Sequence, residues 1–131
     1  MDPKKIWCNL GVKDLERTHS FYTKLGFRPN GKTAELVSFK VGEHDFIIHF
    51  FRDDILEANI KAVLSDPLKV NEVIFTISAQ SPAQVDAWEK EVEVAGGTLI
   101  TKAESFGEGY YGFIFADPDG HRFNVFYMEG L

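Results

Sequence analysis

A strand, a helix and three further strands are predicted twice along the 131-residue chain. Residue patterns that alternate with period two, bounded by glycine and turn residues, predict the strands, whereas capped stretches of helical period predict the helices. In the first copy the strand, helix and three strands are expected at 5–12, 15–25, 27–29, 34–41 and 45–51. In the second copy they are expected at 73–77, 82–95, 98–101, 109–116 and 121–128. This order predicts an α+β fold of two tandem βαβββ modules.

The helix of the second copy carries signals at both ends. Ser81 suits the N-cap, Pro82 the first helical position, and Gln84 completes a capping box. Gly96 and Gly97 supply residues that end a helix. Both boundaries of this helix are therefore predicted from the sequence.

The connection between the copies is also predicted to be helical. Leu56, Ile60 and Leu64 are spaced by four residues, and Asp66-Pro67 ends the pattern. We therefore expect one domain over 1–131. Its parts are expected at about 5–51 for module one, 53–66 for the connecting helix and 71–129 for module two.

Charge and cysteine content exclude several classes of protein. Twenty acidic against 14 basic residues give a net charge of −6, and the basic residues are scattered, so nucleic acid is not an expected partner. Cys8 is the single cysteine, which excludes an intrachain disulfide and a paired-cysteine zinc site. The sequence shows neither a secretory signal nor an apolar run of spanning length. We expect a cytoplasmic protein without a membrane partner.

Strand alternation separates residues that face the helices from those on the other face of each sheet. Cys8, Leu10 and Val12 are expected toward the helix layer, and the residues between them toward the other face of the sheet. Applied to the other strands, with Tyr111 added from the glycine-bracketed segment before it, this predicts a mostly apolar face with a few polar groups, a composition that suits an organic ligand. The expected residues of this face are Trp7, Asn9, His49, Phe51, Ile74, Thr76, Tyr111, Asn124 and Phe126.

Three sequence segments resemble the vicinal oxygen chelate superfamily, which includes glyoxalases, bleomycin-resistance proteins and extradiol dioxygenases. They are Val12-Lys13-Asp14-Leu15, Phe21-Tyr22-Thr23-Lys24-Leu25-Gly26-Phe27 and Phe115-Ala116-Asp117-Pro118-Asp119-Gly120-His121. The Asn9 to Leu15 segment is most similar to small uncharacterised bacterial glyoxalase-like members. The resemblance implies a curved mixed sheet around a cleft with the helices outside, and a homodimer.

The resemblance also implies four metal-ligand positions, one on the first and one on the last strand of each module. Alignment places Trp7, His49, Ile74 and Asn124 there, and only His49 is a competent ligand. An indole and an isoleucine side chain offer no donor to a divalent ion. No cofactor is therefore expected, and a divalent metal is the alternative.

The leading hypothesis is a protein that lacks the family's metal ligands and binds a small organic molecule in its cleft. One alternative is an enzyme, similar to lactoylglutathione lyase or to a dioxygenase, that uses His49 as a base or holds its metal elsewhere. His49 is the best catalytic candidate, although a hydrogen-bonded structural role explains a strand histidine equally well. A second alternative is a drug-sequestering binder similar to the bleomycin-resistance proteins.

Overall fold

A computed structural model describes residues 1–131 as two compact units, 1–64 and 65–131. Each unit holds one mixed sheet, of four strands in the first and five in the second. Three helices accompany the sheets. The predicted α+β class with two βαβββ modules is confirmed. None of the three helices has the length and apolarity needed to cross a membrane.

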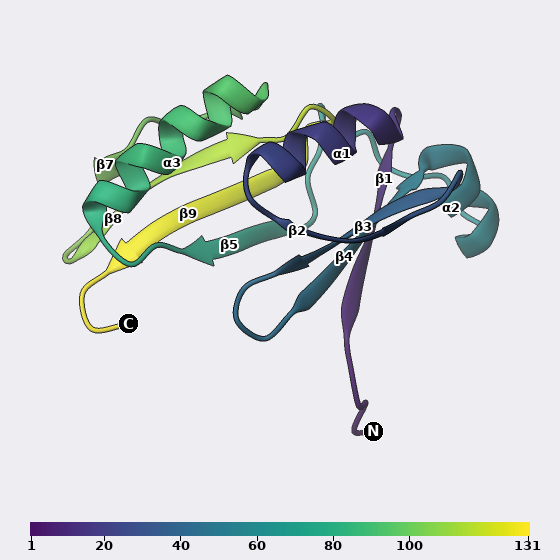
Figure 1. Ribbon diagram of the computed structural model, residues 1–131, viewed down its shortest axis with the longest axis horizontal. Coiled ribbons are helices and arrows are strands. Elements are labelled where there is room, and N and C mark those ends of the chain that lie inside the picture. The colour runs from purple at the N-terminus through teal and green to yellow at the C-terminus, as the bar shows by residue number, and fades with distance from the viewer. The chain divides into compact units, whose positions relative to one another are not determined.

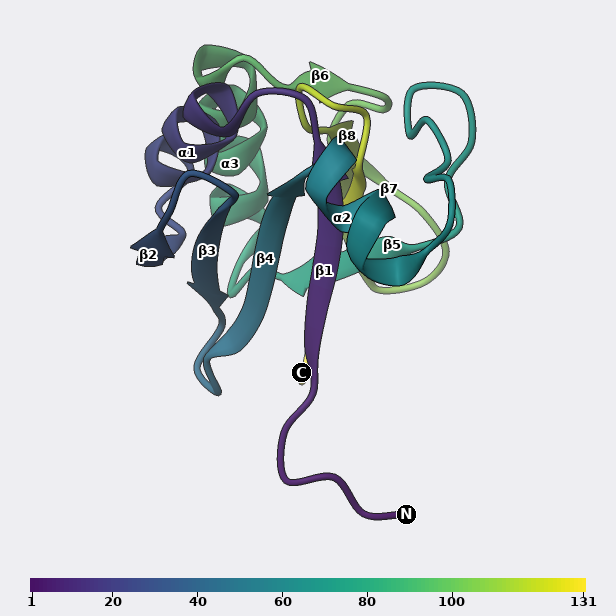
Figure 2. The ribbon, with the colours of Figure 1, turned by 90° about the vertical axis from the view of Figure 1, so that its right-hand side faces the viewer.

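The first unit forms a sheet of strand order β1-β4-β3-β2 with a helix on one face (Figures 1 and 2). Strands β1 and β4 are parallel, and the other pairs are antiparallel. The elements are β1 (Trp7–Val12), α1 (Leu15–Lys24), β2 (Arg28–Lys32), β3 (Leu36–Val41), β4 (Phe46–Arg52) and α2 (Asp53–Ile60).

Helix α1 begins and packs as its sequence predicts. The Asp14 carboxylate caps it by accepting the Arg17 N–H at 3.0 Å. Tyr22 is fully buried and stacks on Phe50 of β4 with ring centroids 4.5 Å apart. This contact fixes which face of the first sheet is covered by helix α1.

Helix α2 is shorter than predicted. It ends at Ile60 because Lys61 adopts a left-handed conformation, with φ 55°. The Glu57 side chain then accepts the Leu64 N–H at 3.1 Å, in place of a further helical turn. Leu64 is thus positioned by a side-chain hydrogen bond rather than by the helical period of the sequence.

The second unit repeats the arrangement with a different outer strand. Its sheet has the order β5-β9-β8-β6, with β7 also paired to β8, and α3 packs against β8 and β9. Strands β5 and β9 are parallel. The elements are β5 (Ile74–Ser78), α3 (Pro82–Ala95), β6 (Thr98–Leu99), β7 (Glu104–Ser105), β8 (Tyr110–Ala116) and β9 (Arg122–Met128).

The predicted strand over 98–101 is replaced by the two-residue strands β6 and β7. Thr101 causes the break, because its hydroxyl oxygen accepts the Ile114 N–H at 2.9 Å. The Ile114 carbonyl in turn accepts the N–H groups of both Ile100 and Thr101. A side chain therefore takes the place of a backbone partner along β8, and the chain leaves the sheet before returning as β7.

Helix α3 confirms both predicted ends. The Ser81 hydroxyl accepts the Gln84 N–H at 3.2 Å, and Gly96 closes the helix with φ 99°. The Gln84 side chain accepts the Gln80 N–H at 2.7 Å, one residue earlier than a capping box requires. Under the helix, Phe123 stacks on Phe75 and Phe115 at 5.2 and 5.1 Å.

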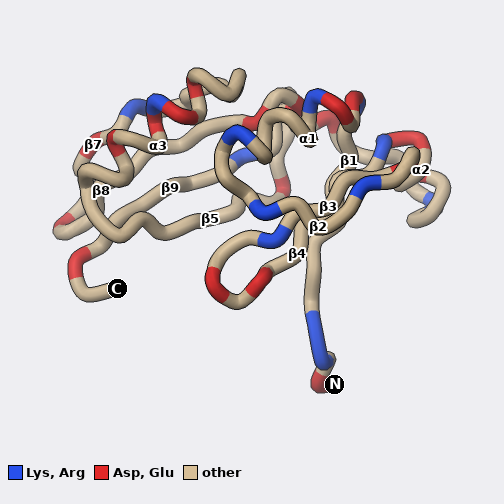
Figure 3. Tube along the Cα trace, in the orientation of Figure 1, with Lys and Arg blue, Asp and Glu red and all other residues tan.

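Charged residues are concentrated on the helices and loops of the second unit (Figure 3). Its three longer strands, β5, β8 and β9, contain a single charged residue, Arg122. The open face of this sheet, meaning the face away from α3, is therefore formed mainly by apolar and uncharged polar side chains. We use the same term in the first unit for the sheet face away from α1.

Candidate functional site

The open face of the first sheet brings together four predicted site residues. Phe50 points to α1, so alternation along β4 places His49 and Phe51 on the open face. Asn9 is paired with His49, and Trp7 precedes Asn9 by two residues on the same face. The His49 ring lies edge-on to Trp7 at 6.4 Å and to Phe51 at 6.1 Å. Trp7 is 52% exposed.

His49 has an unusual environment for a polar residue. Its Nδ1 atom is buried and has no hydrogen-bond partner. Ser38 is opposite His49 on β3, but its hydroxyl accepts the Asn30 amide at 2.9 Å. Burial lowers the pKa of the His49 imidazole below its ordinary value of 6.5. At neutral pH the ring is therefore uncharged, and its chemistry is that of a weak base or a neutral hydrogen-bonding group.

The open face of the second sheet holds the equivalent four residues. Asn124 is paired with Thr76 just as His49 is paired with Asn9, so the two pairs occupy equivalent positions in the two copies. Ile74 precedes Thr76 by two residues and is 59% exposed. Phe126 follows Asn124 by two residues, so it shares this face. That these residues contact a ligand stays a prediction.

Tyr111 does not share that face, which corrects the prediction. Its hydroxyl donates to the Asp86 carboxylate of α3 at 2.6 Å, so its side chain lies on the helix side of β8. This hydrogen bond raises the pKa of the Tyr111 phenol, because it stabilises the protonated form beside a carboxylate. The neighbouring Tyr110 lies on the open face, with its ring centroid 6.4 Å from that of Phe126.

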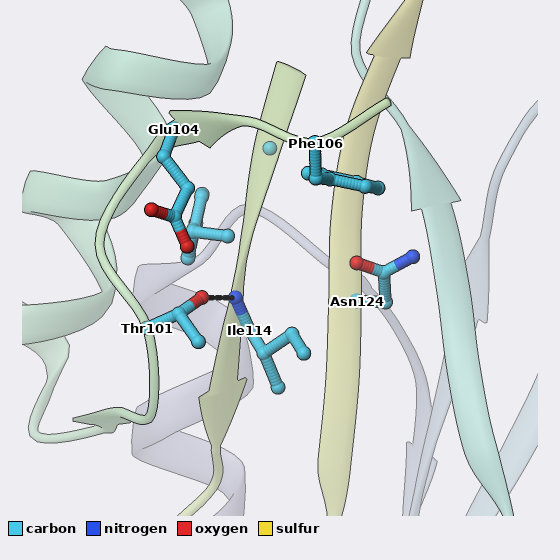
Figure 4. Close-up of a pocket in the computed structure, with 7 residues that line it drawn as sticks. Thr101, Glu104, Phe106, Ile114 and Asn124 are labelled. Carbon is cyan, nitrogen blue, oxygen red and sulfur yellow. Dashed lines mark hydrogen bonds between the residues drawn. The ribbon is translucent and has the colours of Figure 1, made fainter. Parts of the chain in front are cut away.

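A cavity of about 200 Å³ lies within the second unit, on the open face of β8 and β9 (Figure 4). Among the residues that line it, only Asn124 belongs to the predicted site. The lining residues are Thr101, Glu104, Phe106, Gly112, Phe113, Ile114 and Asn124. Three of the others, Thr101, Glu104 and Phe106, lie along the path that the chain takes between β6 and β8, which no sequence pattern predicts.

A short hairpin formed by β7 and the start of β8 contributes the edge of the cavity. Phe106 donates its N–H to the Tyr110 carbonyl at 3.1 Å, and the two rings stack at 6.0 Å. Gly107 and Gly109 have positive φ values of 69° and 76°, which permits the turn. The glycines in the sequence therefore mark a hairpin beside the cavity, and this hairpin presents Glu104 and Phe106 there.

The fold and the open faces define a two-module α+β protein with a cavity of about 200 Å³ on one sheet. A family model for the Glyoxalase/Bleomycin resistance protein/Dioxygenase superfamily matches residues 6–125. The chain therefore belongs to this superfamily. A comparison with curated protein sequences gives no match.

Solved structures share the fold over nearly the whole chain. A hypothetical protein from S. aureus is 28% identical, with a TM-score of 0.86 over 97% of this chain and 95% of that one. A glyoxalase-related enzyme from Fulvimarina pelagi is 20% identical, with a TM-score of 0.84 over 95% and 88% of the two chains. A lactoylglutathione lyase from Agrobacterium tumefaciens is 23% identical, with a TM-score of 0.69 over 97% and 96%.

The side chains at the four ligand positions implied by the resemblance do not fit a divalent metal. Trp7 and Ile74 have no donor atom for an ion, and a neutral amide such as Asn124 is a poor ligand for a transition metal. No group of three or more His, Cys, Asp or Glu side chains in the structure is arranged to hold an ion. The function proposed below therefore involves no metal ion at these four positions.

Proposed function

We propose that the protein binds a small organic molecule on the open faces of its sheets, without using the family's metal site. The observation that carries the proposal is the cavity of about 200 Å³ beside Asn124. Its walls are largely apolar and its polar groups are few, which is the usual composition of a small-molecule site. The ligand we expect has one ring-sized apolar part and a few hydrogen-bonding atoms.

The proposal includes the predicted residues on the first open face. Trp7, His49 and Phe51 present aromatic surface there, and Asn9 adds an amide. The buried, unpartnered Nδ1 of His49 favours a role in contacting a ligand, because an unsatisfied polar atom has a free-energy cost that a bound partner would remove. On the second face, Ile74, Thr76 and Phe126 extend the surface beside Asn124.

Calorimetric titration with 2-phenylethanol, a small neutral aromatic compound, tests the proposal. We expect one-to-one binding that weakens about fivefold in Asn124→Leu, the loss of roughly one hydrogen bond. The control is Asn59→Leu, the same change at an exposed position of α2. Absence of binding, or an equal loss in both variants, would contradict the proposal.

Metal independence is tested separately, by titrating metal-stripped protein with nickel, zinc, cobalt and manganese ions. We expect no stoichiometric site, since His49 alone supplies a competent donor among the four positions. One ion bound per chain with submicromolar affinity, abolished in His49→Ala, would overturn the metal-free part of the proposal.

A second candidate function is catalysis of the lactoylglutathione lyase type, favoured by the uncharged imidazole of His49. The hemithioacetal of methylglyoxal and glutathione, assayed with and without those four metals, separates it from simple binding. Turnover that is lost in His49→Gln would support the enzyme. Drug sequestration is the remaining alternative, and it is tested by bleomycin resistance on overexpression.

We also propose that the protein is a cytoplasmic homodimer, as is expected from the resemblance. Light scattering at micromolar concentration tests the oligomeric state, and a monomer would contradict the dimer. Fractionation of the source cells tests the location.

A further inference from the structure

We propose that the cavity of the second unit selects small aromatic cations, namely protonated amines attached to a phenyl-sized ring, over neutral and anionic molecules of the same shape. This inference rests on the proposed function and specifies its ligand class. It follows from the charges, the hydrogen-bonding groups and the aromatic rings at the cavity.

Glu104 is the only charged residue that lines the cavity. It is at the start of β7, paired with Gly112 of β8, and its side chain extends from the strand toward Thr101 (Figure 4). No lysine or arginine belongs to the lining. Arg122 is two residues before Asn124 on the same strand face, but it is not among the lining residues. The cavity therefore presents one negative charge with no lining cation to neutralise it.

The remaining polar groups at the cavity suit a ligand that donates hydrogen bonds. The Thr101 hydroxyl oxygen already accepts the Ile114 N–H, as the dashed line in Figure 4 shows. The side-chain amide of Asn124 lies across the cavity from Glu104 in the same view, and no dashed line joins it to another lining residue (Figure 4). Its oxygen and the Glu104 carboxylate are thus acceptors available to an ammonium group, which has only donors.

Aromatic rings next to these acceptors suit both parts of such a ligand. Phe106 lines the cavity, is 42% exposed, and is held by its stack on Tyr110. Tyr110 in turn lies 6.4 Å from Phe126, between ring centroids. A ring face attracts a cation and also stacks on another ring. A molecule that joins an aromatic ring to an ammonium group through a short linker would match this combination.

Three nearly isosteric probes separate charge from shape: 2-phenylethylamine, 2-phenylethanol and phenylacetate. We expect the amine to bind about tenfold more tightly than the alcohol, the combined effect of a partly exposed ion pair and a cation–π contact. Phenylacetate should bind most weakly, because Glu104 repels it. The preference for the amine should shrink as salt is added, since the pair is accessible to solvent.

Glu104→Gln keeps the shape of the side chain and removes its charge. In this variant the amine should bind within about twofold of the alcohol, because the negative charge that distinguishes the two probes is gone. Glu108→Gln is the matched control, because it makes the same charge change in the adjacent turn, outside the lining. This control should retain the full preference for the amine.

The outcomes distinguish the inference from the function on which it rests. Equal binding of amine and alcohol, or a preference that survives in Glu104→Gln, overturns the cation inference and leaves small-molecule binding in place. Tightest binding of phenylacetate also overturns it and would indicate that Arg122 governs selectivity. If none of the three probes binds, the proposed function fails together with the inference.

Discussion

The two units share a register but present different chemistry on their open faces. In the first, His49 is paired with Asn9 and contacts Trp7; in the second, Asn124 is paired with Thr76 and lines a cavity. The outer strands account for the difference. Strand β2 is a single five-residue strand, whereas the second unit has the separate short strands β6 and β7. A repeated topology thus fixes the positions, and the break in one strand provides the cavity.

Among the predictions that test this difference, a substitution at Gly112 has the largest expected effect on stability. Its counterpart in the first unit is Leu36, because Gly112 pairs with Phe126 as Leu36 pairs with Phe51. A Cβ atom at Gly112 would lie 2.1 Å from the Val125 carbonyl oxygen. We expect Gly112→Ala to lower the free energy of unfolding by about 3 kcal/mol, measured by urea denaturation.

Gly109→Ala is the control for that experiment. Its φ is 76°, but an added Cβ would meet no atom within 4 Å. The substitution should therefore cost only the left-handed conformation, about 1 kcal/mol. Equal losses of unfolding free energy in the two variants would show that the backbone contact at Gly112 is unimportant. A side chain such as that of Leu36 could then be accommodated at position 112.

The helix caps test where the two units are equivalent. Asp14 caps α1 and Ser81 caps α3, and each accepts one N–H of the first turn. Asp14→Ala and Ser81→Ala should each lower the free energy of unfolding by about 1 kcal/mol. Thermal denaturation of both variants beside Ala83→Ser, an exposed first-turn change without cap loss, provides the measurement. A loss confined to one helix would break the equivalence.

The helix caps also illustrate how much of the fold the sequence predicts. Alternation assigned Trp7 and His49 to one face correctly, and the Ser81 and Gly96 signals located both ends of α3. These features depend on local geometry, which a few neighbouring residues determine. The cavity lining depends instead on the Thr101 hydroxyl replacing a backbone group 13 residues away, and no periodic pattern records such a contact.

Strand alternation also places Tyr111 on the helix side of β8. Phe113 and Phe115 are buried on the helix side of β8, and residues two apart on a strand share a face. Tyr111 therefore belongs with them and with Asp86. The glycine-bracketed segment before Tyr111 pointed to the other face, and the strand alternation contradicts it.

His49 and Asn124 differ in how they respond to pH. Because burial lowers the pKa of folded His49, the unfolded chain binds the proton more readily below about pH 6.5. Stability should fall as the pH decreases through that value, and the loss should be complete below the folded pKa. His49→Gln should remove this part of the acid dependence in denaturant titrations between pH 7.5 and 4.5. His44→Gln, at an exposed turn position, should retain it.

The smallest expected effect concerns the two adjacent tyrosines on β8. Tyr111→Phe removes an exposed hydrogen bond to Asp86, so it should cost about 0.5 kcal/mol or less and leave the binding of 2-phenylethylamine unchanged. Tyr110→Ala removes the ring stacked on Phe106, and it should weaken that binding about threefold. Calorimetric titration of both variants measures the contrast. Weaker binding in Tyr111→Phe with no change in Tyr110→Ala would assign the ligand to the helix side of the sheet, because of these two tyrosines Tyr111 is the one on that side.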